Sequence, residues 1–243
     1  MKNKLIKVAL PLLIWISVWQ ILSLIVSNEY LLPGIPSTIT ALGALLSEFT
    51  FYKAVLFSAL RVLAGLILGI VLGIGIGVAC KRFYYVDTIF APVISIIKST
   101  PVASFIVLLW VLMSGDALSV FIGFLMVLPL IWQSTVDSIN SIDKDTMEVA
   151  KVFEFSMIRK IKLIYLPTLK RFLVPAVISA TGLAWKAEIA AEIIAYTKKS
   201  IGQGINDAKY NMDTPTVFAW TIVIVTFSIL LESVAKRMLR RIK

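Results

Sequence analysis

The stretch that decides the fold is residues 137–171, DSINSIDKDTMEVAKVFEFSMIRKIKLIYLPTLKR, because it is polar in a chain that is otherwise mostly apolar. It carries seven Lys or Arg and five Asp or Glu residues between two long apolar runs. The 243-residue chain is 59% hydrophobic with a mean hydropathy of +0.92, which is too apolar for a water-soluble domain. The stretch is therefore predicted to be a loop outside a membrane, joining two spans.

Apolar runs on either side of this loop predict six membrane-spanning helices. A helix rises 1.5 Å per residue, so about twenty apolar residues cross a hydrocarbon core roughly 30 Å thick. The runs are too long for barrel strands, and backbone groups in lipid must be satisfied within the segment, so the predicted fold is an all-α integral membrane protein. The chain is expected to form one domain, residues 1–243, with spans at about 5–27, 55–80, 86–113, 117–136, 172–195 and 216–236.

The basic residues predict the orientation of these spans. With the N-terminus inside, 17 of the 24 Lys and Arg residues lie in cytoplasmic segments, and only Lys53, Lys198, Lys199 and Lys209 lie in outer loops. Both termini are therefore expected in the cytoplasm. The same distribution explains the net charge of +10 without nucleic acid as a partner. The first run follows a basic start but has no small-residue cleavage site after it, so it is expected to stay as an uncleaved span.

Side chains that perform chemistry in enzymes are scarce. The chain has no histidine, and its one cysteine, Cys80, has no second cysteine with which to form an internal disulfide. These absences leave few conventional routes to an enzyme, so the chain is expected not to be one and to hold no metal or cofactor. The alternative is a membrane-embedded enzyme with a metal at Glu188 and Glu192, which no histidine or cysteine supports.

The second span combines a glycine ridge with a cationic residue. Glycines recur every fourth residue, which predicts close packing of another helix of the same chain, with dimerisation as the alternative. Arg61 lies near the outer end of the span, where it can either extend to the membrane surface or face a polar interior. The ridge consists of Gly65, Gly69, Gly73 and Gly77.

Two further spans contain ionisable residues, which are functional candidates by default. The third span is interrupted by Lys98-Ser99-Thr100-Pro101. It is either a broken helix with Lys98 lining a pathway or two shorter helices with Lys98 near water. In the fifth span, Glu188 and Glu192 are four residues apart and share a helix face, either lining a pathway or forming structural ion pairs. Trp185 and Lys186 precede them.

The polar loop itself predicts two short helices. Asp143 or Asp145 can cap the first, and Asp145 has the capping-box spacing to Glu148. Ser156 can cap a second, basic helix, which is predicted to stop at Pro167.

At this point the chain resembles the permease subunits of type I ABC importers. That family carries an E-A-A helix in the cytoplasmic loop between the fourth and fifth spans, a glycine six residues after the Glu, and a later L-P. Glu148, Ala150, Leu166 and Pro167 match in identity and spacing, whereas Glu154 stands at the glycine position. Since that glycine allows a turn with positive φ, the turn here must be built differently or carry strain.

Other segments resemble the nitrate, taurine and aliphatic-sulfonate branch of the family, which also includes permeases for vitamin precursors and other small organic molecules. The matches cover nearly the whole chain. They are Leu32-Pro33 through Pro36-Ser37-Thr38, Ser58-x-x-Arg61-Val62-x-x-Gly65, Thr100-Pro101-x-Ala103 with Trp110, Leu183-Ala184-Trp185 and Ala190-Ala191-Glu192.

The resemblance implies a type I ABC importer permease fold in the bacterial cytoplasmic membrane. It implies three kinds of partner: a cytoplasmic ATPase dimer that binds ATP and Mg, a second permease copy, expected to be identical, and an extracytoplasmic binding protein that delivers a small solute. The chain has no Walker A motif of its own. A self-sufficient secondary carrier is the rival prediction, but no inverted repeat supports it.

The resemblance also implies roles for particular residues. The cytoplasmic loop helix would couple ATPase closure to the spans, with Glu148, Ala150 and Phe153 as the main contacts. The full coupling set is Glu148, Val149, Ala150, Phe153, Glu154, Leu166 and Pro167. Arg61, Lys98 and Lys186 would suit an anionic solute, and the candidate translocation path is Arg61, Lys98, Trp185, Lys186, Glu188 and Glu192.

Overall fold

The computed structural model describes residues 2–113 and 115–240, and side chains for residues 10–113 and 115–239. Every regular element in this part of the chain is a helix. In order these are α1 (Lys2–Val26), α2 (Ile35–Ser47), α3 (Phe49–Arg82), α4 (Tyr84–Ser99), α5 (Val102–Trp110), α6 (Asp116–Asn140), α7 (Lys144–Val152), α8 (Met157–Lys160), the π-helical turn η1 (Ile161–Tyr165), α9 (Leu166–Ile194), α10 (Ile201–Tyr210) and α11 (Thr214–Arg240).

The helices confirm the membrane-protein prediction. Four are long and apolar enough to cross a membrane, namely α3, α6, the continuous helix Met157–Ile194 and α11, and the pair α4–α5 makes a fifth if it is one broken span. The described apolar part of α1, Leu10–Val26, falls among the shorter apolar helices together with α2. Four to five spans are therefore supported in the part of the chain that the structure describes, and the count of six remains a prediction.

The centre of the bundle is the packing of α3 against α6 and α9. The glycine ridge of α3 faces α6, where a Cβ added at Gly69 would stand 2.5 Å from Val127 and one at Gly77 2.8 Å from Thr135. Such distances leave no room for any side chain but hydrogen, so the ridge brings the two helices into close contact. The prediction that the glycines serve packing within the chain is confirmed.

The third predicted span is two helices rather than one. α4 and α5 are bent by 103° at the break around Thr100 and Pro101. Pro101 has no N–H and restricts the residue before it to extended backbone, and Thr100 accordingly has φ −85° and ψ 130°. Lys98 lies in the last turn of α4 with an exposed side chain, and whether it lines a pathway or lies near water stays a prediction.

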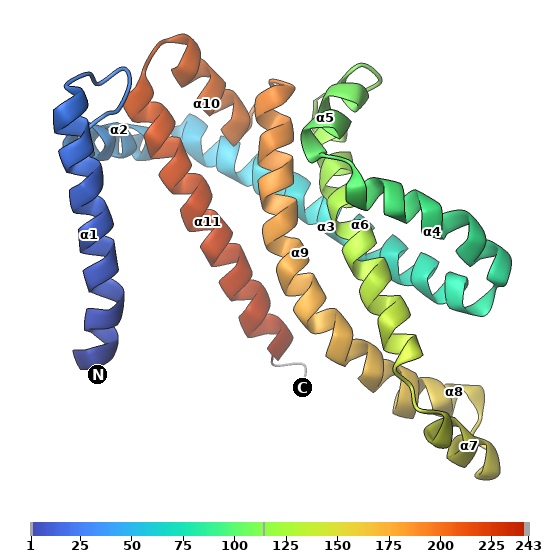
Figure 1. Ribbon diagram of the computed structural model, residues 1–243. Helices are drawn as coiled ribbons and strands as arrows, with labels where there is room; N and C mark the ends of the chain where they lie inside the picture. The colour runs from blue at the N-terminus through green and yellow to red at the C-terminus, as the bar shows by residue number, and fades with distance from the viewer. Residues whose placement is uncertain (1, 114, 241–243) are drawn as a thin grey trace.

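The long helices end at two opposite faces of the molecule. Figure 1 shows α1 beginning and α11 ending at the lower end of the bundle, where α7 and α8 also lie, whereas α2 and α10 lie at the upper end. α1 stands to one side and is held by the stacking of Trp19 on Phe218 and by a 3.0 Å hydrogen bond from the Trp19 indole to the carbonyl of Pro33. The two described ends of the chain are therefore on the face that carries the polar loop.

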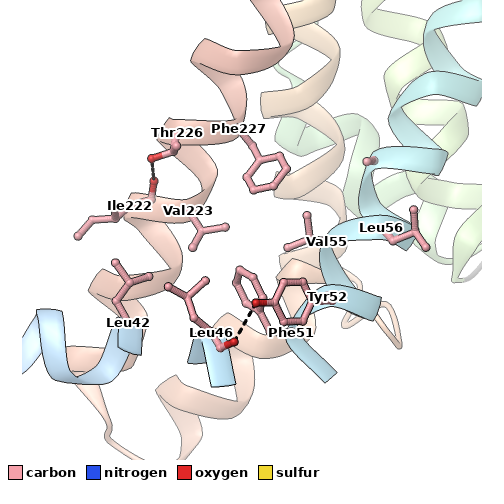
Figure 2. Close-up of a pocket in the computed structure, with 11 residues that line it drawn as sticks. Leu42, Leu46, Phe51, Tyr52, Val55, Leu56, Ile222, Val223, Thr226 and Phe227 are labelled. Carbon is pink, nitrogen blue, oxygen red and sulfur yellow. Dashed lines mark hydrogen bonds between the residues drawn. The ribbon is translucent and has the colours of Figure 1, made fainter. Parts of the chain in front are cut away.

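An apolar groove opens on the outside of the bundle between α2, α3 and α11 (Figure 2). It has a volume of about 530 Å³, and Leu46, Val55 and Phe227 are among the side chains pointing into it. The Tyr52 hydroxyl is occupied, since it donates a 2.9 Å hydrogen bond to the carbonyl of Leu46. The groove offers no charged group among its lining residues, so it does not suit an ionic solute.

Candidate functional site

The first half of the polar loop folds into the short helix α7. Its N-cap is Asp143, whose carboxylate accepts a 3.3 Å hydrogen bond from the backbone N–H of Asp145. The capping box predicted between Asp145 and Glu148 is therefore wrong, because Asp145 already lies inside the first turn and the cap is supplied two residues earlier. The predicted short helix itself is confirmed.

Glu154 builds the turn that ends α7. Its φ is +51°, in the left-handed region that favours glycine. The backbone N–H of Phe155 donates to the carbonyl of Ala150 at 2.9 Å, and the N–H of Glu154 donates to that of Lys151 at 3.1 Å. These two bonds define a Schellman motif with Glu154 at the position usually taken by glycine. The turn is thus the ordinary one, and a glutamate adopts it with backbone strain of about 1–2 kcal/mol.

The two sides of α7 differ sharply in exposure. Phe153 is 68% exposed, and Val149 and Glu148 also lie on the surface, although an apolar helix face normally turns inward. Ala150, in contrast, is only 1% exposed and packs against its own chain. The helix therefore exposes an apolar face with one carboxylate, while Ala150 on its other side packs against the rest of the chain.

The second half of the loop does not stop at Pro167 as predicted. Ser156 does cap it, accepting a 3.4 Å hydrogen bond from the N–H of Arg159, but the helix then runs on through η1 into α9. In η1 the N–H of Leu166 bonds to the carbonyl of Ile161, five residues back. In an α-helical turn the Pro167 ring would clash with the carbonyl of the preceding turn. The wider π-helical turn gives the ring more room. Leu166 and Pro167 are both exposed.

A buried polar cluster lies near the upper end of the central helices. The Arg61 guanidinium donates to the Asp116 carboxylate at 2.9 and 2.6 Å and to Glu192 at 3.0 Å. Arg61 and Glu192 are buried, whereas the Asp116 side chain is 75% exposed. Of the two alternatives for Arg61, the structure shows the polar interior, and Glu192 takes the role of structural ion pairing.

The remaining hydrogen bonds of Glu192 hold α10 against the cluster. The Ser58 hydroxyl donates to Glu192 at 2.8 Å and accepts from the N–H of Ile201 at 3.1 Å. The N–H of Gly202 donates to the same carboxylate at 3.3 Å. A buried charge is stable only when its lone pairs are satisfied in this way. The cluster therefore joins α3, α9 and the start of α10.

Glu188 lies one helical turn deeper and has a different environment. It is 0% exposed, and neither carboxyl oxygen has a hydrogen-bond partner among the side chains and backbone that the structure describes. A Cβ at Gly65 would stand 2.4 Å from Glu188 Oε1, and one at Gly123 would stand 1.8 Å from it. The two glycines thus form the space that the carboxyl group fills between α3 and α6.

The other candidate path residues are dispersed. Trp185 is fully buried, and its indole donates a 3.0 Å hydrogen bond to the carbonyl of Ile224 on α11. Lys186, the next residue of α9, is exposed. Lys98 is also exposed, at the edge of a cavity of about 370 Å³ that Trp132 and Gln133 of α6 help to line. The structure thus brings together Arg61, Glu188 and Glu192 but not the two lysines.

Sequence reasoning missed three residues of the buried cluster. Asp116 and Gly123 were not singled out, and Ser58 appeared only within a family motif. Asp116 could have been predicted, because it is a carboxylate next to the predicted start of the fourth span, at about the same membrane depth as Arg61 near the outer end of the second span. Gly123 gave no signal, because its function depends on a side chain 65 residues away in sequence.

Comparisons with known proteins agree with this architecture. Residues 65–243 match the family described as "Binding-protein-dependent transport system inner membrane component". The nitrate import permease protein NrtB of Synechococcus elongatus is 28% identical over 86% of this chain and 80% of its own length. The putative aliphatic sulfonates transport permease protein SsuC of Bacillus subtilis is 23% identical over 93% of this chain and 83% of its own.

A solved structure supports the fold. A chain of the MetNI methionine ABC transporter in an inward-facing conformation superposes with a TM-score of 0.65 at 15% identity, covering 80% of this chain and 97% of that one. The family match covers well over half of the present sequence. The chain therefore belongs to the binding-protein-dependent inner membrane components, the permease subunits of ABC importers.

Proposed function

We propose that two copies of this permease form the translocation path for a small anion, with six spans per copy and both termini in the cytoplasm. An extracytoplasmic binding protein delivers the solute, and a separate ATPase dimer supplies the energy. The observation that carries this proposal is α7, a rigidly capped helix that exposes Phe153 and Val149 at the face where the long helices end. An apolar face exposed outside the membrane is typical of a docking surface.

In this proposal α7 docks on the ATPase. Glu148 makes a charged contact, Val149 and Phe153 insert into an apolar groove, and Ala150 is the small buried residue on which the helix sits. The continuous helix from Met157 to Ile194 then carries the movement into the membrane, because a helix transmits a push along its axis as a rigid body. Glu154, Leu166 and Pro167 shape the two turns of this connection.

The anionic substrate class rests on charge and on the names of the relatives, a nitrate and an aliphatic-sulfonate permease. Lys98 and Lys186 are exposed cations that form no ion pair with a described side chain, so they can attract an anion. Arg61 is engaged by two carboxylates in this conformation. Together with Glu188, Glu192 and Trp185 it would contribute to the path only after the helices rearrange.

The test is solute-stimulated ATP hydrolysis by the complete complex in proteoliposomes, with nitrate, taurine and alkanesulfonates each supplied with the binding protein. Glu148→Ala and Phe153→Ala are expected to lower stimulation at least tenfold, as the loss of a buried interface anchor does. Phe49→Ala is the matched control, because Phe49 is a similarly exposed phenylalanine at the other end of the bundle.

Wild-type stimulation by nitrate, an alkanesulfonate or the zwitterionic sulfonate taurine would identify the substrate class. Stimulation only by solutes without an anionic group would contradict the anion proposal but leave the coupling proposal intact. Full activity of both α7 variants would show that the ATPase docks elsewhere.

A further inference from the structure

The lower end of the bundle contains a cavity to which the proposed function assigns no ligand. It has a volume of about 390 Å³, within the range of about 300–1,000 Å³ typical of small-ligand pockets. It opens where the last turn of α3 meets the end of α6 and the segment from α8 to the start of α9. Its lining residues are Val78, Lys81, Arg82, Ser138, Ile139, Met157, Ile161, Tyr165, Leu166 and Leu169.

The cavity combines apolar walls with a cationic rim. Most of its lining side chains are apolar, and three of them, Met157, Ile161 and Leu166, remain exposed. The two charged lining residues, Lys81 and Arg82, are adjacent and exposed. Neither forms an ion pair within the part of the chain whose side chains are described. A ligand that matches this surface has an anionic head and a hydrocarbon tail.

Neighbouring aromatic residues indicate at which level of the membrane the cavity lies. Phe83, Tyr84 and Tyr85 directly follow the two cations and are all strongly exposed. Exposed aromatic side chains at the end of a spanning helix are typical of the membrane–water interface, at the level of the lipid headgroups. We therefore expect Lys81 and Arg82 at the level of the lipid phosphates, and Val78, one turn back along α3, at the level where acyl chains begin.

We propose that this cavity binds one anionic phospholipid, with its phosphate between Lys81 and Arg82 and an acyl chain along Val78, Ile139 and Leu169. Basic pockets between spanning helices bind anionic headgroups by this combination of charge and apolar contact. The outer groove of Figure 2 lacks charged lining residues, so it does not select lipids by charge. Lipid binding extends beyond the proposed function and requires only that the chain lie in a membrane, whereas its effect on coupling rests on the proposed function.

The bound lipid would brace the connection between the loop helix and the membrane. One wall of the cavity belongs to α3 and α6, and the other to Met157, Ile161 and Tyr165 of α8 and η1. The latter segment contains the wide π-helical turn ahead of α9. An acyl chain between the two walls holds the segment against the bundle, so the lipid is expected to increase the fraction of α7 movement that reaches α9.

The experiment is native mass spectrometry of the purified, delipidated permease–ATPase complex titrated with phosphatidylglycerol or phosphatidylcholine. Lys81→Gln/Arg82→Gln is expected to weaken phosphatidylglycerol binding about 25-fold, since each Lys or Arg near an anionic membrane contributes about a factor of five. Lys236→Gln/Arg237→Gln is the matched control, with the same charge change in the exposed end of α11. Ile139→Trp fills the cavity and is expected to abolish binding of both lipids there.

Three results would overturn the proposal. The first is equal binding of the two lipids by the wild type. The second is that the α11 control loses as much phosphatidylglycerol binding as Lys81→Gln/Arg82→Gln, which would indicate general surface electrostatics. The third is that a second copy of the chain, and not lipid, protects the thiol of an Ile139→Cys variant from labelling. Binding is measured without solute or ATP, so its failure is distinguishable from failure of the transport proposal.

Discussion

The buried cluster around Arg61 and the exposed segment around α7 are both polar interruptions of an apolar chain, but they are stabilised in different ways. In the cluster, Arg61 and Glu192 pair with each other and are also satisfied by partners on two other helices, Asp116 of α6 and Gly202 of α10. In the segment, α7 is built from its own Asp143 cap and its own Schellman turn. The cluster is therefore a property of the packed bundle, and the segment is a local structure.

This difference separates stability from function. Charges that leave water must be paired, so a change in the cluster is expected to alter unfolding. An exposed apolar side chain on a self-contained helix loses little on truncation, typically less than about 0.5 kcal/mol, so a change there is expected to alter only docking. The following substitutions test the comparison, from the largest expected effect on stability to the smallest.

The largest effect is expected for Arg61→Met. It removes the partner of Glu192, a carboxylate that is almost fully buried, and a buried charge left alone costs about 3–5 kcal/mol. The measurement is the unfolding free energy of the purified complex in mixed micelles. Adding Glu192→Gln should recover part of the loss. If the single variant unfolds like wild type, the ion pair does not hold the bundle together.

Gly123→Ala is expected to follow, with a loss of about 3 kcal/mol from overpacking, because its Cβ would meet Glu188 Oε1 at 1.8 Å. Gly75→Ala is the control, since a Cβ at Gly75 meets nothing within 4 Å. Thermal unfolding of the complex distinguishes the two. Combining Gly123→Ala with Glu188→Ala should restore stability, and a failure to do so would place the clash elsewhere.

Glu188→Met is expected to raise the unfolding free energy by about 1 kcal/mol, because an apolar side chain of similar length replaces a buried carboxyl group without a described partner. Glu192→Gln, which weakens bonds to Arg61 and Ser58, should lower it instead. The two variants are compared by the same unfolding titration. Equal losses of unfolding free energy in both variants would contradict the prediction and would mean that the Glu188 carboxyl group has a hydrogen-bond partner.

The smallest effect is expected for Glu154→Gly in the exposed segment. Glycine adopts φ of +51° without strain, and its greater freedom in the unfolded chain offsets part of that gain, leaving about 0.5 kcal/mol. Glu154→Ala keeps the strain and should show no gain. Hydrogen exchange of the α7 amides measures the local stability, and an equal gain from alanine would exclude the strain account.

Much of the exposed segment could be predicted from the sequence because its determinants are local. Asp143 was one of two predicted caps for α7, and Ser156 was the predicted cap of the next helix. Asp145 was the wrong choice because a cap residue lies outside the first turn, and a small shift in where the helix begins changes which side chain can cap it. The end at Pro167 was wrong because a π-helical turn accommodates proline, and its formation depends on the helix that follows.

The sequence by itself determined that the chain is a helical membrane protein, that a polar loop lies between its fourth and fifth predicted spans, and to which family it belongs. Apolar runs, charge distribution and local motifs carry that information along the chain. Only the tertiary structure decided that Arg61 pairs with Glu192 and Asp116, and that Glu188 fills the space left by Gly65 and Gly123. These facts depend on which helix faces meet, and the rotation and depth of packed helices are set by contacts far apart in sequence.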